Sequence, residues 1–378
     1  MRLLGVGMCA AALAAGLLAA PAYAEDVHDV KGSDVKGSDA QGLRGVGWAL
    51  KETGKDSRFR GLAAVSRSTA WVAGSKGTVL RTVDGGRSWR DVSPPGAVAE
   101  GLELRDIEAF DARRAVALSI GEGEASRVLR TEDGGATWTE TFRNPDPRAF
   151  YDCLTFFDSR HGLAVSDPVD GRFRILSTDD GGRNWSVLPS TGMPDALPGE
   201  AGFAASGQCL VSAGSRDVWL ATGGGAAARI LHSADRGRTW RIAESGIPAG
   251  DPAKGVFALA FRDRTRGLAV GGDYRTGEAS PQAAAASADA GRTWSPAQTP
   301  PPAYRSGAAW LPHLRDAALA VGPTGTDVTT DGGRSWRPLT PGSFDTGSFD
   351  TVDCAGDGGC WAAGEKGRVG RLEPQEGA

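Results

Sequence analysis

An eight-residue pattern, Ser/Thr-x-Asp-x-Gly-x-(Ser/Thr/Asn)-Trp, occurs six times between residues 82 and 336. A repeated unit of this size cannot bury its apolar face alone, so the pattern constrains the chain to an array of similar, mutually packed units. The copies span residues 82–89, 131–138, 178–185, 233–240, 287–294 and 329–336. Their fixed residues are Asp84, Trp89, Asp133, Trp138, Asp180, Trp185, Asp235, Trp240, Asp289, Trp294, Asp331 and Trp336.

The chemistry of the octet is that of a tight turn between two strands. The Asp carboxylate can accept hydrogen bonds from the backbone N–H groups that follow it, and Gly supplies a positive φ. The Trp then buries a large ring beside the turn. A calcium loop would need several oxygen donors at alternating positions and a closing Glu, which these octets lack. We therefore expect the octets to be structural.

Short apolar segments precede each octet and have the length of β-strands. These segments come in pairs, such as residues 69–74 with 78–81 and residues 160–165 with 173–176. Residues 217–222 and residues 266–271 each resemble the first segment of such a pair. Gly and Asp separate these segments, and no helical period runs through them. Successive octet Trp residues lie 42 to 55 positions apart, which is the size of a four-stranded propeller blade.

The blade count comes from the two ends of the repeat array. Trp48 lies 41 positions before Trp89, where the fourth strand of a blade is expected. The other three strands of that blade do not precede it in the sequence. Those three strands follow the last octet, at residues 349–353, 360–364 and 367–371. The sequence predicts an all-β, seven-bladed propeller over residues 46–373, in which the N-terminal strand completes the C-terminal blade and removes the free sheet edges.

The first 24 residues have the order of a secretory signal peptide. Arg2 precedes an apolar run, and Ala22-Tyr23-Ala24 is a small-x-small cleavage site. Residues 25–45, with their duplicated Val-Lys-Gly-Ser-Asp, are predicted to be a flexible linker, and residues 374–378 a tail. The formal charge is −4, or −5 without Arg2. We expect a periplasmic or secreted protein with no membrane span after signal removal.

The remaining composition limits cofactors and partners. Cys354 and Cys360 flank a Gly-rich turn and are predicted to form a disulfide, whereas Cys153 and Cys209 leave their pairing open. The four His residues show no ligand spacing, so we expect no metal, and no dinucleotide fingerprint suggests a cofactor. The mild acidity gives no reason to expect nucleic acid.

The octet is similar to the Asp-box (BNR-like) repeat of sialidases, sortilin-type receptors and photosystem II assembly factors of the Ycf48/HCF136 type. The run from Trp71 to Gly86, together with the seven-blade count, resembles most closely the Ycf48-like group, in its exported bacterial branch. Such a resemblance implies a fold and leaves the function to be argued from the site. It implies an exported propeller without an established reaction.

The sialidase motif is not matched. Sialidases share a Phe/Tyr-Arg-Ile-Pro phrase before the first Asp-box, whereas Phe173-Arg174-Ile175-Leu176 lacks the Pro and follows the second octet. This segment is also explained as an ordinary third strand. Other glycosidases require only two carboxyl groups across a cleft, so a glycoside hydrolase stays an alternative.

Blade topology places the octet turns on one face, here called the octet face. The second-to-third-strand loops and the connections between blades lie on the opposite face, here called the long-loop face, where binding residues are expected. Its candidate binding residues are Tyr151, Glu200, Arg229, Lys254, Asp273, Tyr274, Tyr304 and Arg305. The main hypothesis is a monomeric binding or scaffold module, an assembly factor for an envelope or membrane protein complex, with a protein or glycan ligand. The alternative is a sialidase-like or other hydrolase using Asp167, Glu200, Asp273 or Glu365.

Overall fold

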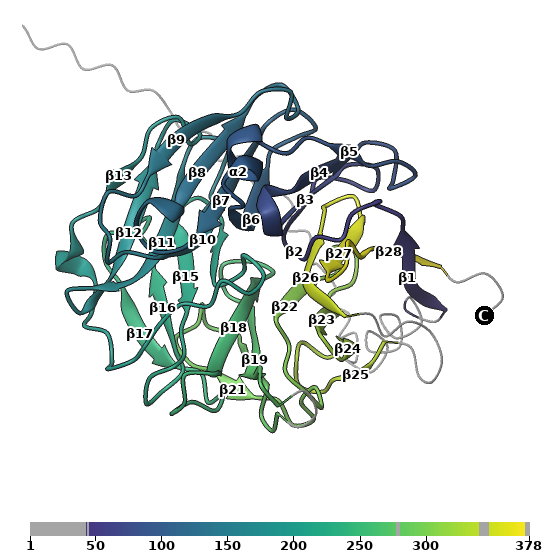
Figure 1. Cartoon of the computed structure of the whole chain (residues 1–378). Helices are drawn as coiled ribbons and strands as arrows, with labels where there is room; N and C mark the ends of the chain where they lie inside the picture. The colour runs from purple at the N-terminus through teal and green to yellow at the C-terminus, as the bar shows by residue number, and fades with distance from the viewer. Residues whose placement is uncertain (1–42, 44, 277–279, 340–347, 375–378) are drawn as a thin grey trace, which may run out of the picture.

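The computed structural model describes residues 43, 45–276, 280–339 and 348–374. Within these residues, the strands form seven four-stranded antiparallel sheets around a central axis (Figure 1). The predicted seven-bladed propeller is therefore confirmed. The predicted signal peptide, the linker apart from Leu43 and Gly45, and the tail apart from Pro374 lie outside the described residues.

Each blade places its first strand at the axis, where first strands of neighbouring blades contact one another. The first blade consists of β2(Phe59–Ala64), β3(Ala70–Gly74), β4(Val79–Thr82) and β5(Arg90–Asp91), and the second of β6(Glu103–Ala109), β7(Ala115–Ile120), β8(Arg127–Thr131) and β9(Thr139–Arg143). The third blade consists of β10(Tyr151–Phe156), β11(Gly162–Val169), β12(Arg172–Thr178) and β13(Ser186–Val187), and the fourth of β14(Leu210–Ala213), β15(Asp217–Ala221), β16(Arg229–Ser233) and β17(Arg241–Glu244). The fifth blade consists of β18(Lys254–Phe261), β19(Gly267–Asp273), β20(Ala284–Ser287) and β21(Ser295–Pro296), and the sixth of β22(Gly307–Trp310), β23(Ala318–Gly322), β24(Gly325–Thr329) and β25(Arg337–Pro338). The seventh blade combines β26(Phe349–Cys354), β27(Cys360–Gly364) and β28(Val369–Pro374) with β1(Val46–Lys51).

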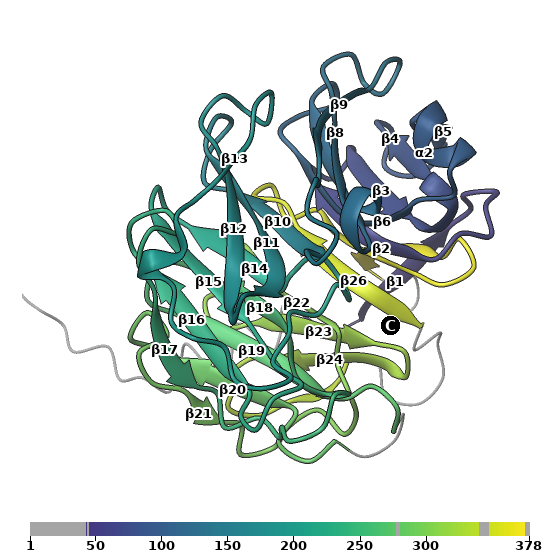
Figure 2. The same ribbon diagram turned by 60° about the vertical axis from the view of Figure 1, so that its left-hand side comes forward.

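Strand β1 closes the ring by pairing antiparallel with β28, from Val46 opposite Pro374 to Lys51 opposite Val369. Its Trp48 ring packs on Phe349, and the indole N–H donates to Thr326 Oγ1 of the sixth blade at 2.9 Å. The purple strand β1 lies beside β28 at the outer edge of the seventh blade (Figure 1), and β2 lies beside the yellow strand β26 (Figure 1, Figure 2). The N-terminal strand thus links the two ends of the chain, as the blade count predicts.

The octets form one repeated turn between the third and fourth strands. In the first copy, Asp84 Oδ1 accepts from the backbone N–H of Ser88 at 3.0 Å, and Asp84 Oδ2 accepts from the Ser88 hydroxyl at 2.6 Å. The Thr82 hydroxyl donates to the same carboxylate and accepts from the N–H of Gly86, whose φ is 81°. In the other five octets the carboxylate likewise accepts from the N–H four residues on, and the first Ser or Thr makes both of its bonds.

Trp rings join neighbouring blades. Trp138 of the second blade meets Trp71 of the first edge-on, with ring centroids 6.4 Å apart, and Trp89 meets Trp361 of the seventh in the same way. The Trp71 indole N–H donates to the Asp111 carbonyl of the second blade. The three Trp residues on second strands, Trp71, Trp219 and Trp361, are fully buried. These contacts therefore make the blade interfaces part of one continuous core.

The non-strand elements are few. Among the described residues the only α-helix is α2(Pro95–Ala99), a single turn that the sequence analysis does not anticipate, beside the 3₁₀ turns η1(Ser75–Gly77), η2(Gly123–Ala125) and η3(Ser190–Gly192). No helix in this part of the chain has the length and apolarity to cross a membrane. The predicted Cys354–Cys360 disulfide is present, and a second disulfide joins Cys153 to Cys209.

Candidate functional site: an arginine pocket on the axis

Five inner strands carry a β-bulge at the same place, near their start on the long-loop face. In each, one residue has no partner on the second strand, so the pairing register shifts across it. A bulge of this kind re-aims the side chain of the extra residue. The bulged residues are Arg60 in β2, Arg105 in β6, Asp152 in β10, Phe257 in β18 and Asp350 in β26.

Four of these five residues line one pocket, of about 420 Å³, at the long-loop end of the axis. The exception is Asp152, which is buried beside Gly202. Three arginines, a carboxylate and aromatic rings from five blades therefore converge on one concave site, here called the axial pocket. Its lining residues are Arg58, Arg60, Arg105, Phe203, Ala204, Ala205, Phe257, Tyr274, Tyr304, Pro323 and Asp350.

The positive charge of the axial pocket is incompletely neutralised. Arg58 holds both oxygens of Asp350 at 2.7 Å, and these hydrogen bonds raise the pKa of the Arg58 guanidinium. Arg60 reaches the same carboxylate only at 4.0 Å, and its buried Nε has no hydrogen-bond partner among the described residues. Burial consequently lowers the pKa of Arg60. The pocket thus presents a desolvated guanidinium whose nearest carboxylate is already engaged.

Arg105 adds a third cation from the neighbouring second blade. Its Nη1 donates to the Ala204 carbonyl at 3.1 Å, and its Nε lies 3.7 Å from Glu103. The contact with Glu103 is long and the Glu103 side chain is 44% exposed, so solvent screens it. A bound anion would meet guanidinium groups from two adjacent blades.

Aromatic rings form the remaining wall. Phe203 stacks on Phe257 with centroids 3.9 Å apart, and Tyr304 meets Phe257 edge-on at 4.7 Å. Tyr274 packs at the rim of Phe257 and is 53% exposed, which is the highest exposure among the large apolar side chains of this wall. An arginine cluster beside an exposed aromatic ring is a combination typical of protein interfaces.

Residues 203–208 cross the axis and form the floor of the pocket. Gln208 donates to the carbonyls of Ala308 and Val352, each at 2.9 Å, and accepts from the Ala308 N–H. The hydroxyl of Thr351 donates to the Ser206 carbonyl. This segment, here called the plug, is bonded to four blades besides its own and ends at the Cys153–Cys209 disulfide. It separates the axial pocket from the opposite end of the channel.

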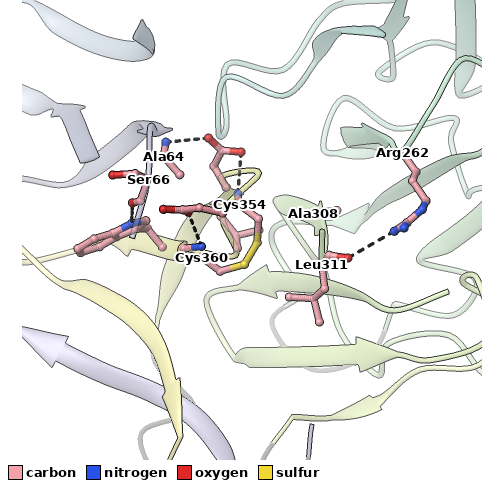
Figure 3. Close-up of a disulfide and its surroundings, with 12 residues drawn as sticks. Ala64, Ser66, Arg262, Ala308, Leu311, Cys354 and Cys360 are labelled. Carbon is pink, nitrogen blue, oxygen red and sulfur yellow. Dashed lines mark hydrogen bonds between the residues drawn. A yellow bond between two sulfur atoms is a disulfide. The ribbon is translucent and has the colours of Figure 1, made fainter. Parts of the chain in front are cut away.

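The octet-face end of the channel holds a second cavity, of about 580 Å³, floored by Ser206, Gly207 and Gln208. Its walls include the carboxyl groups of Asp106, Glu108 and Asp353, and burial raises the pKa of all three. The Cys354–Cys360 disulfide lies at this end, between Ala64 and Arg262 (Figure 3). The two ends of the channel are therefore chemically distinct, arginine-rich on one face and acidic on the other.

The predicted binding residues divide into two groups. Tyr274 and Tyr304 line the axial pocket. The others do not line it, and most are enclosed by partners. The Tyr151 ring is buried against Phe142, and Glu200 binds Arg229 and Thr222. Lys254 lies opposite Asp273 in the β18–β19 pairing, and Asp273 contacts Arg275. Arg305 is buried against Asp327.

The four carboxylates of the hydrolase alternative are engaged separately. The Glu200 side chain has no exposed surface and is held by Arg229, whereas Glu365 lies 3.0 Å from Arg58 at the rim of the axial pocket. Asp167 accepts from the Gly202 N–H at 2.8 Å and adjoins Asp152. Burial raises the pKa of Asp167 to about 6 and that of Asp152 well above its usual value. No group of acidic, His or Cys side chains in the described ranges is arranged to hold a metal ion.

Six residues that line the axial pocket are not predicted from the sequence: Arg58, Arg60, Arg105, Phe203, Phe257 and Asp350. Five of them lie on or beside inner strands and four of these five are the bulged residues, whereas Phe203 lies in the long connection between β13 and β14. The available signal is the charged residue at the start of an inner strand, where the neighbouring positions are apolar. It appears in Arg58-Phe59-Arg60 and in Glu103-Leu104-Arg105.

Comparison with known proteins supports the fold. No protein-family model matches the chain, and no curated protein matches it in sequence. Among solved structures, "YCF48 bound to D1 peptide" aligns with a TM-score of 0.60 at 14% identity, covering 86% of this chain and 94% of that one. YCF48 from Cyanidioschyzon merolae gives 0.61 at 15% identity, with 86% and 99% covered. The GH74 xyloglucanase from Xanthomonas campestris gives 0.60 at 16% identity, covering 85% of this chain and 53% of that one. At these identities the likeness establishes the propeller and nothing finer.

Proposed function

We propose that this protein is an exported binding and scaffold propeller whose axial pocket takes an acidic segment of a protein partner. The observation that carries the proposal is Arg60, a desolvated guanidinium whose Nε has no hydrogen-bond partner among the described residues and faces a pocket open to the long-loop face. A carboxylate of the partner would supply the missing charge-assisted hydrogen bonds. The likeness to a propeller solved with a bound peptide supports a peptide ligand.

The pocket has the parts that such recognition requires. Arg60 and Arg105 would receive the carboxylate, and Tyr274 offers an exposed ring for an apolar neighbour of that residue. The plug gives the pocket a fixed floor, so the partner would insert a side chain or a chain end and would not thread through the ring. Exported propellers with such a pocket fit a role in assembling envelope protein complexes.

The test is peptide binding with matched variants. An array of acidic peptides and their Gln/Asn isosteres is probed with the wild type and with Arg60→Gln/Arg105→Gln. We expect acidic peptides to bind the wild type and to lose about tenfold or more in affinity with the double variant, because two charge-assisted contacts disappear. Arg172→Gln removes an exposed arginine paired with Asp195 on the same face and is expected to leave binding unchanged.

Equal binding of acidic peptides and their isosteres, or equal losses in Arg172→Gln, would overturn the proposal. The Tyr304→Ala/Arg305→Ala pair is unsuitable for this test, because Arg305 is 2% exposed and its loss would leave Asp327 buried without a partner. The hydrolase alternative needs two carboxyl groups facing each other across a cleft. The separate partners of Asp167, Glu200, Asp273 and Glu365 give it no support.

A further inference from the structure

A groove of about 560 Å³ lies between the fourth and fifth blades on the octet face, and it shares no lining residue with the axial pocket. Two octet turns and the β18–β19 loop form its walls. Its lining residues are Asp217, His232, Ala234, Thr239, Trp240, Arg241, Arg264, Thr265, Ala290 and Arg292. Three arginines and one aspartate therefore share this groove.

The imidazole of His232 is held in its neutral form. Its Nδ1 faces the guanidinium of Arg241, whose Nε donates to it at 2.9 Å, so this nitrogen must be the acceptor. The other nitrogen, Nε2, then carries the proton and donates to Asp217 Oδ1 at 2.8 Å. The ring also stacks on Trp219 with centroids 4.6 Å apart. His232 consequently orients Arg241 and brings no negative charge to it.

Among the residues that the structure describes, Arg241 has no carboxylate partner. Besides its bond to His232, Arg241 donates from Nη2 to the Ala290 carbonyl at 3.1 Å, and its Nη1 bonds to none of the described residues. Burial, and then the neighbouring charge of Arg292, lower the pKa of Arg241. Asp289 also interacts electrostatically with Arg241, but its carboxylate accepts hydrogen bonds from Ser287 and Thr293 of its own octet.

The other two cations are free to meet a ligand. Arg264 uses only Nε, which donates to Asp217 Oδ2 at 2.7 Å, and its side chain is 67% exposed. Arg292 is exposed and makes no hydrogen bond or ion pair with the part of the chain that the structure describes. Asp217 is the single acidic side chain of the groove and is shared between His232 and Arg264. The groove thus carries positive charge that the protein itself leaves unbalanced.

We propose that this inter-blade groove binds a phosphate group through the guanidinium groups of Arg241, Arg264 and Arg292. Planar guanidinium forks match phosphate oxygens in pairs, and three cations against one engaged carboxylate favour a multiply charged oxyanion. The groove is much larger than one phosphate, so the group is carried by a larger ligand. Either a soluble phosphorylated molecule or a phospholipid headgroup supplies this chemistry. The groove and the axial pocket are on opposite faces, so this proposal is independent of the proposed function.

The experiment measures binding of inorganic phosphate by equilibrium dialysis. The host is the Arg60→Gln/Arg105→Gln variant, which removes two arginines of the axial pocket that could also bind phosphate. We expect saturable binding in the host and a loss of at least about fivefold in affinity when Arg292→Ala and Arg264→Ala are added. Arg334→Ala is the matched control, because Arg334 holds the Arg292 position in the octet of the sixth blade and is also exposed.

Two further arms separate the sources. Sedimentation with vesicles of phosphatidylglycerol, compared with phosphatidylcholine alone, tests the headgroup, and glucose 6-phosphate in the dialysis tests a soluble ligand. Binding in either arm that depends on Arg264 and Arg292 supports the proposal. The proposal is wrong if phosphate shows no saturable binding to the host, or if Arg334→Ala weakens binding as much as the pair Arg264→Ala and Arg292→Ala while melting temperatures stay equal.

Discussion

Aspartate side chains stand in two opposite electrostatic environments in this propeller. In the octets the carboxylate is exposed and accepts several hydrogen bonds, first from the side chain and then from the backbone of Ser88 or Thr137. These bonds lower the pKa of Asp84 and of Asp133 to about 2. Because the folded pKa is depressed, the stabilisation is complete above pH about 4 and is lost as the pH falls through about 2.

The octet aspartate therefore predicts a pH-dependent mutational effect. Asp133→Ala removes the acceptor for the Thr137 N–H and hydroxyl, and we expect its melting temperature at pH 7 to fall by about 2 to 4 °C. The difference from the wild type should shrink as the pH approaches 2. Asp195→Ala, which removes an aspartate 80% exposed and paired only with Arg172, is the control. Equal melting temperatures of Asp133→Ala and the wild type at pH 7 would contradict this role.

The buried pair Asp152 and Asp167 predicts the opposite dependence of stability on pH. Burial raises the folded pKa of Asp167 to about 6, so the pair's contribution to stability is complete below pH about 4 and is lost as the pH rises through about 6. The free energy of unfolding should fall across this window, and the shift of Asp167 alone accounts for at most about 3 kcal/mol of that fall. Asp167→Asn keeps an acceptor for the Gly202 N–H and should flatten the fall. An unchanged pH profile of urea unfolding in this variant would count against the raised pKa of Asp167.

At the scale of elements, the plug depends on the Cys153–Cys209 disulfide, which joins residues 56 positions apart, whereas Cys354 and Cys360 are separated by 6. In the chain-entropy description, a longer closed loop restrains the unfolded chain more strongly. We expect Cys153→Ser/Cys209→Ser to lower the free energy of unfolding by about 4 kcal/mol, and Cys354→Ser/Cys360→Ser by about 2 kcal/mol. Chemical denaturation measures both.

The two disulfide variants should also differ in binding. The Cys153–Cys209 bridge anchors the segment that carries Phe203, which lines the axial pocket, whereas the Cys354–Cys360 bridge lies at the octet-face end. Acidic-peptide affinity should therefore fall only in the first variant. Equal affinities in the two variants would show that the plug does not shape the pocket.

The sequence predicts the elements far better than the site. Octet spacing and the displaced Trp48 were sufficient for seven blades and for the closing strand, because these features repeat along the chain. The axial pocket depends instead on where four inner strands bulge, which is a property of pairing between strands and not of composition. Glu200 and Arg305 illustrate the opposite error, since charged residues in long loops look exposed until their buried partners, Arg229 and Asp327, are known.

At the scale of the whole molecule, ring closure rests on one short strand. Six residue pairs join β1 to β28, and Trp48 packs on Phe349 in the core of the seventh blade. Without β1, the seventh blade would expose the edge of β28 and the ring would lose the contact of Trp48 with Thr326 in the sixth blade. The closure is thus the contact through which the two ends of the chain stabilise each other.

Truncation tests this closure directly. Removing residues 1–51 should lower the melting temperature strongly and promote self-association through the β28 edge, seen by size-exclusion chromatography. Removing residues 1–42 is the matched control, because Leu43 is the first residue that packs into the described core, and it should leave both measurements unchanged. A synthetic peptide of residues 43–52 added to the longer truncation should restore part of the lost melting temperature, since it can pair with β28. A longer truncation that melts like the control would mean that six blades and three strands hold the ring closed without β1.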